Sequence, residues 1–481
     1  MPRFGLLVSM ATATVSALTL ASVAAHADPL STNDYQIDLY QGPLLLPIRV
    51  VSLGGSYAGY GEDISGMVAN AAAPAVREAH AFRHVEVDLA GSFSFPLDLF
   101  ENNDFDNSGD IDADYSSFIY LNGGVMVQVG SFGAGVLGDL QTYRLTNPSG
   151  TTTAVVVGRY HGLVATSLVE GQLAVGAGVR AVSMGFATQE EDDFYYVGAS
   201  PQVGFLARPN GIPFRFGATI RMPVTASPAN TQPRHDGVAR VGNLTLPNRV
   251  VQPWELEVGV AVQVGPRPLN IPFVDPEDMD DEAEQRVKRA REDRARDRQR
   301  ILDSEPDPER RATLDRELRQ ADEDLRAQEE AWLDRESDYA LGRLDDAFSE
   351  LPRQRLLLLL SLVTSGPVAR GVSLERFLAQ NEPAASSEGV IGKAGAEVNF
   401  SPRFGVEGEP IDNRLVMRVG SYYEPSRFSA VGRQHFTFGA LLKLFTTDVF
   451  GLLPELPYGV EAGVDLAPRY QSVSATITAF R

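Results

Sequence analysis

The chain of 481 residues contains no cysteine, so it forms no disulfide, holds no metal through thiolates and carries no lipid on an N-terminal cysteine. Positive charge is in deficit, with 42 Lys and Arg against 63 Asp and Glu and a formal net charge of −21. That balance argues against nucleic acid as a partner. Long apolar runs are also missing, since after residue 27 the longest is Leu356–Leu360. A membrane helix needs roughly 20 apolar residues, so only a closed β-barrel is left as a way to cross a bilayer.

Histidine is scarce as well, and after residue 27 none stands in a metal-binding or nucleophile motif. A phosphate-cradling glycine loop is also missing from the sequence. We therefore interpret the chain as a non-enzyme without an organic cofactor. The histidines concerned are His80, His84, His161, His235 and His435.

The first 27 residues have the pattern of a secretory signal peptide. Met1–Arg3 gives a positively charged start, and Phe4–Ala25 is almost wholly apolar or small. Ala25–Ala27 then supplies the small-x-small pattern that signal peptidase cuts. We expect cleavage before Asp28 and export of the remaining chain.

The body of the chain alternates between apolar and polar residues. Between Trp254 and Val264, one parity holds Trp, Leu and Val, while the other holds Glu, Gly, Ala and Gln. Because side chains two residues apart lie on one side of a strand, one face is apolar and the other polar. Such runs span about ten residues, which suits a tilted membrane strand better than the shorter strand of a soluble sandwich.

The same alternation predicts fourteen strands, eight within 82–265 and six within 353–481. Tight turns at 170–171 and 209–211 alternate with long connections such as 224–247. Bacterial outer-membrane barrels have short periplasmic turns and long external loops. The predicted strands are 82–96, 116–130, 131–145, 152–169, 172–187, 194–208, 212–223, 248–265, 353–364, 389–402, 413–424, 434–446, 458–467 and 469–480.

The segment 266–352 interrupts this pattern. It is dominated by Asp, Glu and Arg, and it divides into two helical halves at Ser304–Pro308. Heptad spacing of apolar residues predicts that the halves pair as a hairpin, placed in the periplasm by the strand count. Two interpretations remain open: a solvated coiled coil without a ligand, or a docking arm for a periplasmic protein. The heptad residues are Leu314, Leu318, Ala321, Leu325 and Trp332.

The region before the first strand carries a family resemblance. Arg49–Ala58 reads RVVSLGGSYA, and an acidic pair, Glu62 and Asp63, precedes Asn70 by seven residues counted from Asp63. This resembles the hatch of the long-chain fatty-acid outer-membrane transporter family (FadL/TodX-type barrels for hydrophobic compounds). Ala71 stands where that family has Pro, and Pro74 arrives three residues late. A second segment, Arg418–Pro425, is similar to an R-x-G-x-Y-x-E-P run on a late strand of these barrels.

The resemblance implies that residues 28–81 form a hatch, or plug. The expected fold is all-β: a 14-stranded antiparallel transmembrane β-barrel with an N-terminal hatch and a periplasmic α-helical hairpin insertion. The expected function is passive outer-membrane transport of hydrophobic small molecules, namely long-chain fatty acids, other lipids or hydrocarbons. The alternative is a non-transporting barrel scaffold that binds a partner protein through the hairpin or through acidic outer loops. The residues expected to bind ligand are Arg49, Val50, Leu53, Gly54, Gly55, Tyr57, Asp63 and Asn70 in the hatch and Val182, Met184, Val416, Tyr422 and Leu441 on the inward wall.

Arg49 is expected to pair with an inward acid of the wall. Four acids fall on polar parities: Glu86, Asp88, Glu255 and Glu257. Such a pair would fix the hatch to the barrel.

A calcium-loop pattern occurs in the first long outer loop. Its spacing matches the first nine positions of an EF-hand loop, but Tyr115 stands where the bidentate Glu belongs. A Ca²⁺ site and an ordinary acidic loop both remain open. The candidate ligands are Asp104, Asp106, Ser108, Asp110 and Asp112.

Overall fold

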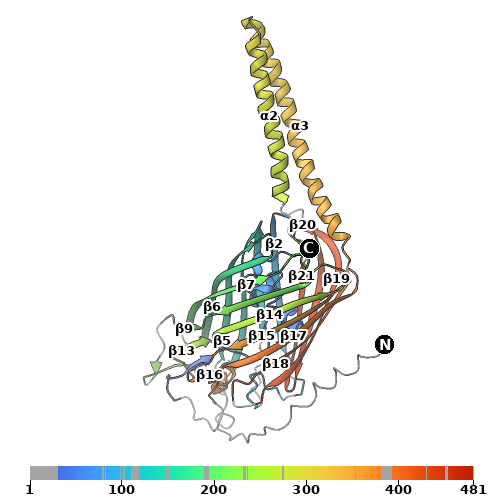
Figure 1. The fold of residues 1–481 in the computed structure, drawn as a ribbon. Coiled ribbons are helices and arrows are strands. Elements are labelled where there is room, and N and C mark those ends of the chain that lie inside the picture. Colours follow the sequence, from blue (N-terminus) through green and yellow to red (C-terminus); the bar gives the residue numbers. More distant parts are fainter. Residues whose placement is uncertain are drawn as a thin grey trace, which may run out of the picture.

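Fourteen antiparallel strands close into a barrel in the computed structural model (Figure 1). β2 pairs with β3 on one side and with β21 on the other, and this second pairing closes the wall. The strands are β2 (Val85–Pro96), β3 (Ile119–Val129), β4 (Phe132–Thr146), β5 (Thr152–Leu168), β6 (Leu173–Thr188), β7 (Phe194–Ala207), β8 (Phe214–Arg221), β14 (Glu255–Val264), β15 (Leu356–Ser365), β17 (Asn399–Ile411), β18 (Leu415–Glu424), β19 (Arg433–Val449), β20 (Leu453–Ala467) and β21 (Tyr470–Ala479). The structure describes residues 31–481 except 79–80, 82, 98, 101–102, 110–118, 147–151, 189–193, 231–233, 236, 273–275, 353, 382–392, 429–430, 450–452 and 480–481.

The predicted alternation is confirmed along the wall. On β14, Leu256 faces outward, whereas Glu257 and Ala261 are buried in the lumen. Even the leucine run of β15 alternates, with Leu357 and Leu359 inside and Leu360 outside. The outer surface therefore carries an apolar belt, which is the surface that lipid chains require.

Two strands differ most from prediction. The tenth strand was expected at 389–402, but β17 begins at Asn399. Its register explains the shift: β17 pairs with the whole of β15, from Ser365 opposite Asn399 to Leu356 opposite Gly408.

The eighth strand was expected to be continuous over 248–265, but it is divided into β13 (Arg249–Gln252) and β14. Pro253, which cannot donate to a ladder, lies between them. Beyond this break a short strand from the N-terminal segment, β1 (Gln36–Asp38), pairs in parallel with β13 and with β16 (Gly371–Ser373). β1 thus lies between β13, which continues the line of β14, and β16, which follows β15.

The end of the lumen opposite the hairpin is filled by an apolar cluster, which we call the outer apolar cluster because the strand count predicts that this end faces outward. It joins β1, the wall strands β4–β7 and several short elements of the long loops. These short elements are β9 (Val224–Pro228), β11 (Val238–Val241), β12 (Leu244–Thr245) and α4 (Leu374–Leu378). β11 and β12 form a small separate sheet with β10 (Arg234–His235), and η3 (Ala379–Asn381) follows α4.

The hatch fills the lumen with three short helices, α1 (Ile48–Ser52), η1 (Ile64–Val68) and η2 (Ala73–Ala75). Inward-facing glycines of the wall let its backbone come close. A β carbon at Gly217 would lie 2.1 Å from the carbonyl oxygen of Ala58. Only glycine permits such an approach of two backbones.

The hairpin projects from the barrel end opposite the long loops (Figure 1). It consists of α2 (Pro276–Ser304) and α3 (Pro308–Ser349), with 29 and 42 residues. At 1.5 Å per residue the helices are about 43 and 63 Å long. Asp307 caps α3 by accepting from the Glu309 amide, and Pro308 occupies its first turn. Among the described residues, no helix combines the length and the apolar composition needed to cross a membrane.

The predicted heptad seam is only partly at the helix–helix interface. Leu325 is 40% exposed, and Ala321 is exposed as well. Ion pairs also join the two helices, including Arg291–Glu329 at 2.7 Å and Arg298–Asp315 at 2.7 Å. Trp332 of the predicted seam does lie at the interface, where the Arg286 guanidinium is 5.9 Å from the centroid of its ring. The pairing of the halves was therefore predicted, but the ion pairs between them were not.

Candidate functional site

Arg49 anchors the hatch, but not to the acids expected from the sequence. Its guanidinium lies 2.5 Å from Asp63 within the hatch and 3.4 Å from Glu407 on β17. Of the four expected acids, Glu255 and Glu257 instead pair with arginines of the wall. Parity alone identifies inward acids, but it does not give their height in the barrel.

Other predicted hatch residues form one apolar cluster. Val50, Leu53 and Tyr57 are buried together with Leu357 and Leu359 of the wall. Gly54 and Gly55 follow with φ of +61° and +72°, and a β carbon at Gly54 would meet the backbones of β17 and β18. The hatch motif therefore encodes a tight turn pressed against the wall.

Asn70 joins the hatch to β7 and β8. Its side-chain amide donates to the carbonyls of Ala58 at 2.8 Å and Phe205 at 3.0 Å. Its oxygen accepts from the Ala72 amide at 2.9 Å and the Thr219 hydroxyl at 3.2 Å. The hatch turn forms even though Ala71 replaces Pro, since Asn70 fixes the backbone on both sides.

The five inward wall residues are buried but do not form one continuous lining. Val182 and Met184 belong to the outer apolar cluster. Tyr422 packs against Leu44 and Val51, whereas Val416 and Leu441 face each other across β18 and β19. The structure thus brings these residues into three separate places.

A cavity of about 150 Å³ lies between the N-terminal segment and the wall. Its apolar lining includes a leucine triplet that sequence reasoning missed, Leu44–Leu46. Prolines flank the triplet, at Pro43 and Pro47, directly before the hatch motif. That sequence signal could have identified it. The hatch contributes Gly55, Val68 and Ala69 to the same cavity.

The polar lining of the cavity is largely paired. Arg180 lies 3.3 Å from Glu255, and Arg221 lies 3.1 Å from Glu257. Arg403, also in the lining, donates to the Gly55 carbonyl at 3.3 Å. The charges mainly bind the wall and hatch together, so the leucines provide the apolar contact surface of the cavity.

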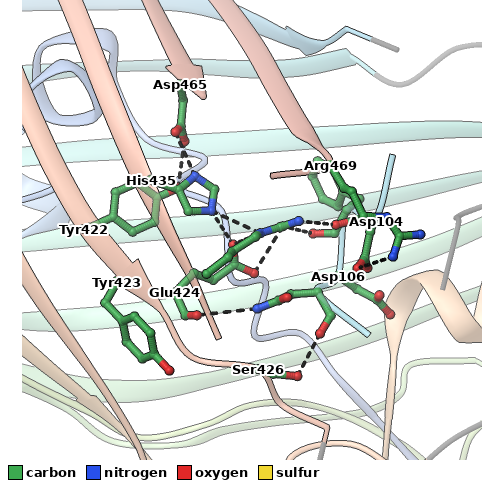
Figure 2. Close-up of polar contacts among 12 residues, drawn as sticks. Asp104, Asp106, Tyr422, Tyr423, Glu424, Ser426, His435, Asp465 and Arg469 are labelled. Atoms are coloured by element: carbon green, nitrogen blue, oxygen red, sulfur yellow. Dashed lines mark hydrogen bonds and ion pairs between the residues drawn. The ribbon is translucent and has the colours of Figure 1, made fainter. Parts of the chain in front are cut away.

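Figure 2 shows a second polar cluster, around His435, that was not predicted. Both imidazole nitrogens face carboxylates: Nδ1 is 2.8 Å from Asp465 and Nε2 is 2.5 Å from Glu424. The Tyr422 hydroxyl donates to Asp465 at 2.7 Å and accepts from the Leu44 amide at 3.2 Å. Tyr422 of the Arg418–Pro425 segment therefore holds the N-terminal segment against the wall, whereas Glu424 binds His435 and Arg433 within the wall.

The candidate calcium loop is folded against this cluster. Asp104 accepts from the amides of Ser108 and Gly109, and Asp106 accepts from Ser108 and from the Ser373 hydroxyl. Burial raises the pKa of both aspartates above the usual range. Asp110 and Asp112 lie outside the described residues. Within the described part of the chain, no group of three His, Asp or Glu side chains is arranged to hold a metal ion, and calcium binding stays a prediction.

No protein-family model and no curated protein sequence matches the chain. Among solved structures it is similar to a Pseudomonas aeruginosa FadL homologue, with 10% identity, a TM-score of 0.46 and coverage of 93% of this chain and 100% of that one. It is also similar to the CymD monoaromatic hydrocarbon channel, with 9% identity, a TM-score of 0.45 and coverage of 91% and 98%. The P. putida toluene transporter TodX gives 10% identity, a TM-score of 0.40 and coverage of 93% and 100%. These structures are of the kind that the hatch motif indicated. Similarity of this size carries no conclusion about function, which must be argued from the chain's own residues.

Proposed function

We propose that this protein lets hydrophobic small molecules cross the outer membrane passively, with long-chain fatty acids, other lipids or hydrocarbons as the cargo class. One observation carries the proposal: apolar contacts continue from the outer end of the lumen to the hatch. Leu39 and Val182 belong to the outer apolar cluster and also line the cavity. Ala69 lines the cavity and belongs to the apolar cluster of the hatch.

A path of this kind suits an apolar solute. Each Å² of apolar surface gains roughly 25 cal/mol on leaving water, so a cargo molecule that passes from one apolar cluster to the next avoids the cost of returning to water. A channel for polar solutes has a hydrated polar lumen instead. The signal peptide and the outward apolar belt support an outer-membrane location. This role requires no catalytic residue and no cofactor.

Locking the hatch to the wall tests the proposal. The Ala71 amide donates to the Thr219 hydroxyl at 3.0 Å, so hatch and wall are in direct contact at these two positions, and cysteines are introduced there to form a disulfide. The native chain has no cysteine that could mispair. The oxidised Ala71→Cys/Thr219→Cys variant should lose uptake of oleate and toluene in cells deprived of their own long-chain uptake protein. A reductant should restore it.

Each single cysteine variant serves as the control, and both should transport normally. Undiminished uptake by the oxidised double variant would contradict the proposal. So would a native protein that takes up no hydrophobic compound at all.

A second function, binding of a periplasmic protein by the hairpin, is favoured by one specific observation. The helices project from the barrel, and Ile301 and Leu325 stay about two-fifths exposed on them, at 43% and 40%. Cross-linking from cysteines placed at these two positions would reveal a partner. A protein that neither cross-links there nor needs its hairpin for uptake would exclude this second function.

A further inference from the structure

The short segment between β14 and the hairpin folds back under the hatch. We call residues 266–271 the strap. It has the sequence PRPLNI and is followed by Pro272, so proline stiffens its backbone. Leu269 and Asn270 are buried, and Leu269 packs in one cluster with the hatch residues Tyr57, Ala58 and Tyr60. The strap is therefore in direct apolar contact with the hatch.

Arg215 of β8 joins the strap to the hatch. Its side chain is 1% exposed. Toward the hatch, it lies 2.7 Å from Glu62 and donates to the Tyr60 carbonyl at 3.1 Å. Toward the strap, it donates to the Leu269 carbonyl at 2.8 Å and the Asn270 side-chain oxygen at 2.7 Å. Burial acts to raise the pKa of Glu62, but Arg215 together with Tyr60, Arg49 and Arg208 more than offsets it, so the pKa lies below its ordinary value.

A second arginine repeats this arrangement. Arg208 donates to the Arg77 carbonyl at the end of the hatch at 2.9 Å and to the Ile271 carbonyl of the strap at 3.0 Å. The strap is also fixed to the wall. The Asn270 side-chain amide donates to the carbonyls of Pro209 and Ile212 in the β7–β8 turn and to that of Phe214, the first residue of β8. Both arginines thus share their donors between strap and hatch.

The strap also contacts the base of the hairpin. The Arg267 guanidinium lies over the Phe348 ring of α3, 5.3 Å from its centroid. On the other side of the hairpin, Arg355 lies 2.8 Å from Glu407, the wall acid that also binds Arg49 of the hatch. The chain segments before α2 and after α3 therefore both contact wall residues that bind the hatch, namely Arg215 and Glu407.

We propose that the strap locks the hatch and couples it to the hairpin, so that displacing the hairpin from the periplasmic side releases the hatch. The physical reason is the sharing of donors. If the strap leaves, Arg215 loses two of its four acceptors while it stays buried, and a buried donor without a partner is costly. The closed position of the hatch is then favoured less. Coupling of this type is reciprocal, so hatch and hairpin each bias the other. It does not depend on which molecule crosses the barrel.

Hydrogen–deuterium exchange of the hatch in the purified full-length protein tests the coupling. The amides of Tyr60, Gly61 and Gly66 are hydrogen-bonded within the hatch and report its opening. Asn270→Ala and Arg215→Met should raise their exchange rates about tenfold, the effect of losing buried hydrogen bonds. Phe348→Ala should raise them about threefold, since one cation–π contact is lost. Deleting 276–349 should raise them at least as much as Phe348→Ala.

A truncated hairpin is the matched control. Removing only 292–328 and closing the helices with a Gly-rich turn keeps Phe348 and the base of the hairpin, so hatch exchange should stay at the native rate. If Asn270→Ala speeds exchange but Phe348→Ala and the 276–349 deletion do not, the coupling to the hairpin is overturned. If Asn270→Ala and Arg215→Met both leave exchange unchanged, the lock itself is overturned. Should Arg215→Met fail to fold, Asn270→Ala alone decides the lock. Uptake is not measured here, so failure of the transport proposal would leave this result intact.

Discussion

At the scale of single residues, the position of the hatch depends on wall glycines, which have no side chain to keep the hatch backbone away. Gly217→Ala would place a methyl group 2.1 Å from the Ala58 carbonyl oxygen, so wall and hatch cannot both keep their positions. Overpacking of this kind costs about 1–3 kcal/mol. Because the barrel ladder is far more extensive than the hatch contacts, we expect the hatch to yield. Hatch amide exchange should accelerate by at least about fivefold, the factor that corresponds to 1 kcal/mol, while the barrel stays folded.

Gly162→Ala is the matched control, because no atom lies within 4 Å of its added methyl group. It should leave hatch exchange unchanged. Equal exchange in the two variants would show that the approach of Ala58 to Gly217 does not position the hatch.

The residue scale is also where the sequence was least informative. The Leu44–Leu46 cavity depends on contacts between residues hundreds of positions apart, such as Leu44 with Tyr422. The His435 cluster joins residues of three neighbouring strands, since His435 of β19 contacts Glu424 of β18 and Asp465 of β20. Alternation shows that a residue points inward, but the partner depends on the stagger of the strands. Arg49 therefore binds an inward acid of the wall, as predicted, but this acid is Glu407 and not one of the four that were predicted.

At the scale of elements, the period-2 pattern was sufficient for the number of wall strands and for the place of most of them, because inside and outside differ so strongly in polarity. It misplaced β17 and did not show the break between β13 and β14. The pattern could not predict β1, a three-residue strand whose pairing with β13 and β16 depends on the gap between two distant strands. It also missed the strap, since six residues rich in proline look like an ordinary linker. Short segments whose structure comes from their surroundings leave no periodic signal.

The hairpin leads to a prediction at the same scale. β14 and β15 pair directly from Val264 opposite Leu356 to Glu255 opposite Ser365, so their ladder does not pass through α2 or α3. Replacing 276–349 by a short Gly/Ser linker should leave a barrel that inserts into membranes and retains its heat-modifiable migration on gels. A deleted protein that cannot assemble would show that the hairpin supports the wall.

At the scale of the whole molecule, stability comes from closure. β2 pairs with both β3 and β21, so the barrel has no free edge, and every wall strand has two neighbours. Unfolding one strand therefore exposes the ladders of two others, which makes the transition cooperative and slow in detergent. The unboiled protein should migrate ahead of the boiled form on a gel, with a far-UV spectrum dominated by strand and a helical minority from α2 and α3. Partial proteolysis that removes the hairpin should reduce the helical signal but leave the difference in migration. A spectrum dominated by helix, or a single migration before and after boiling, would contradict the closed barrel.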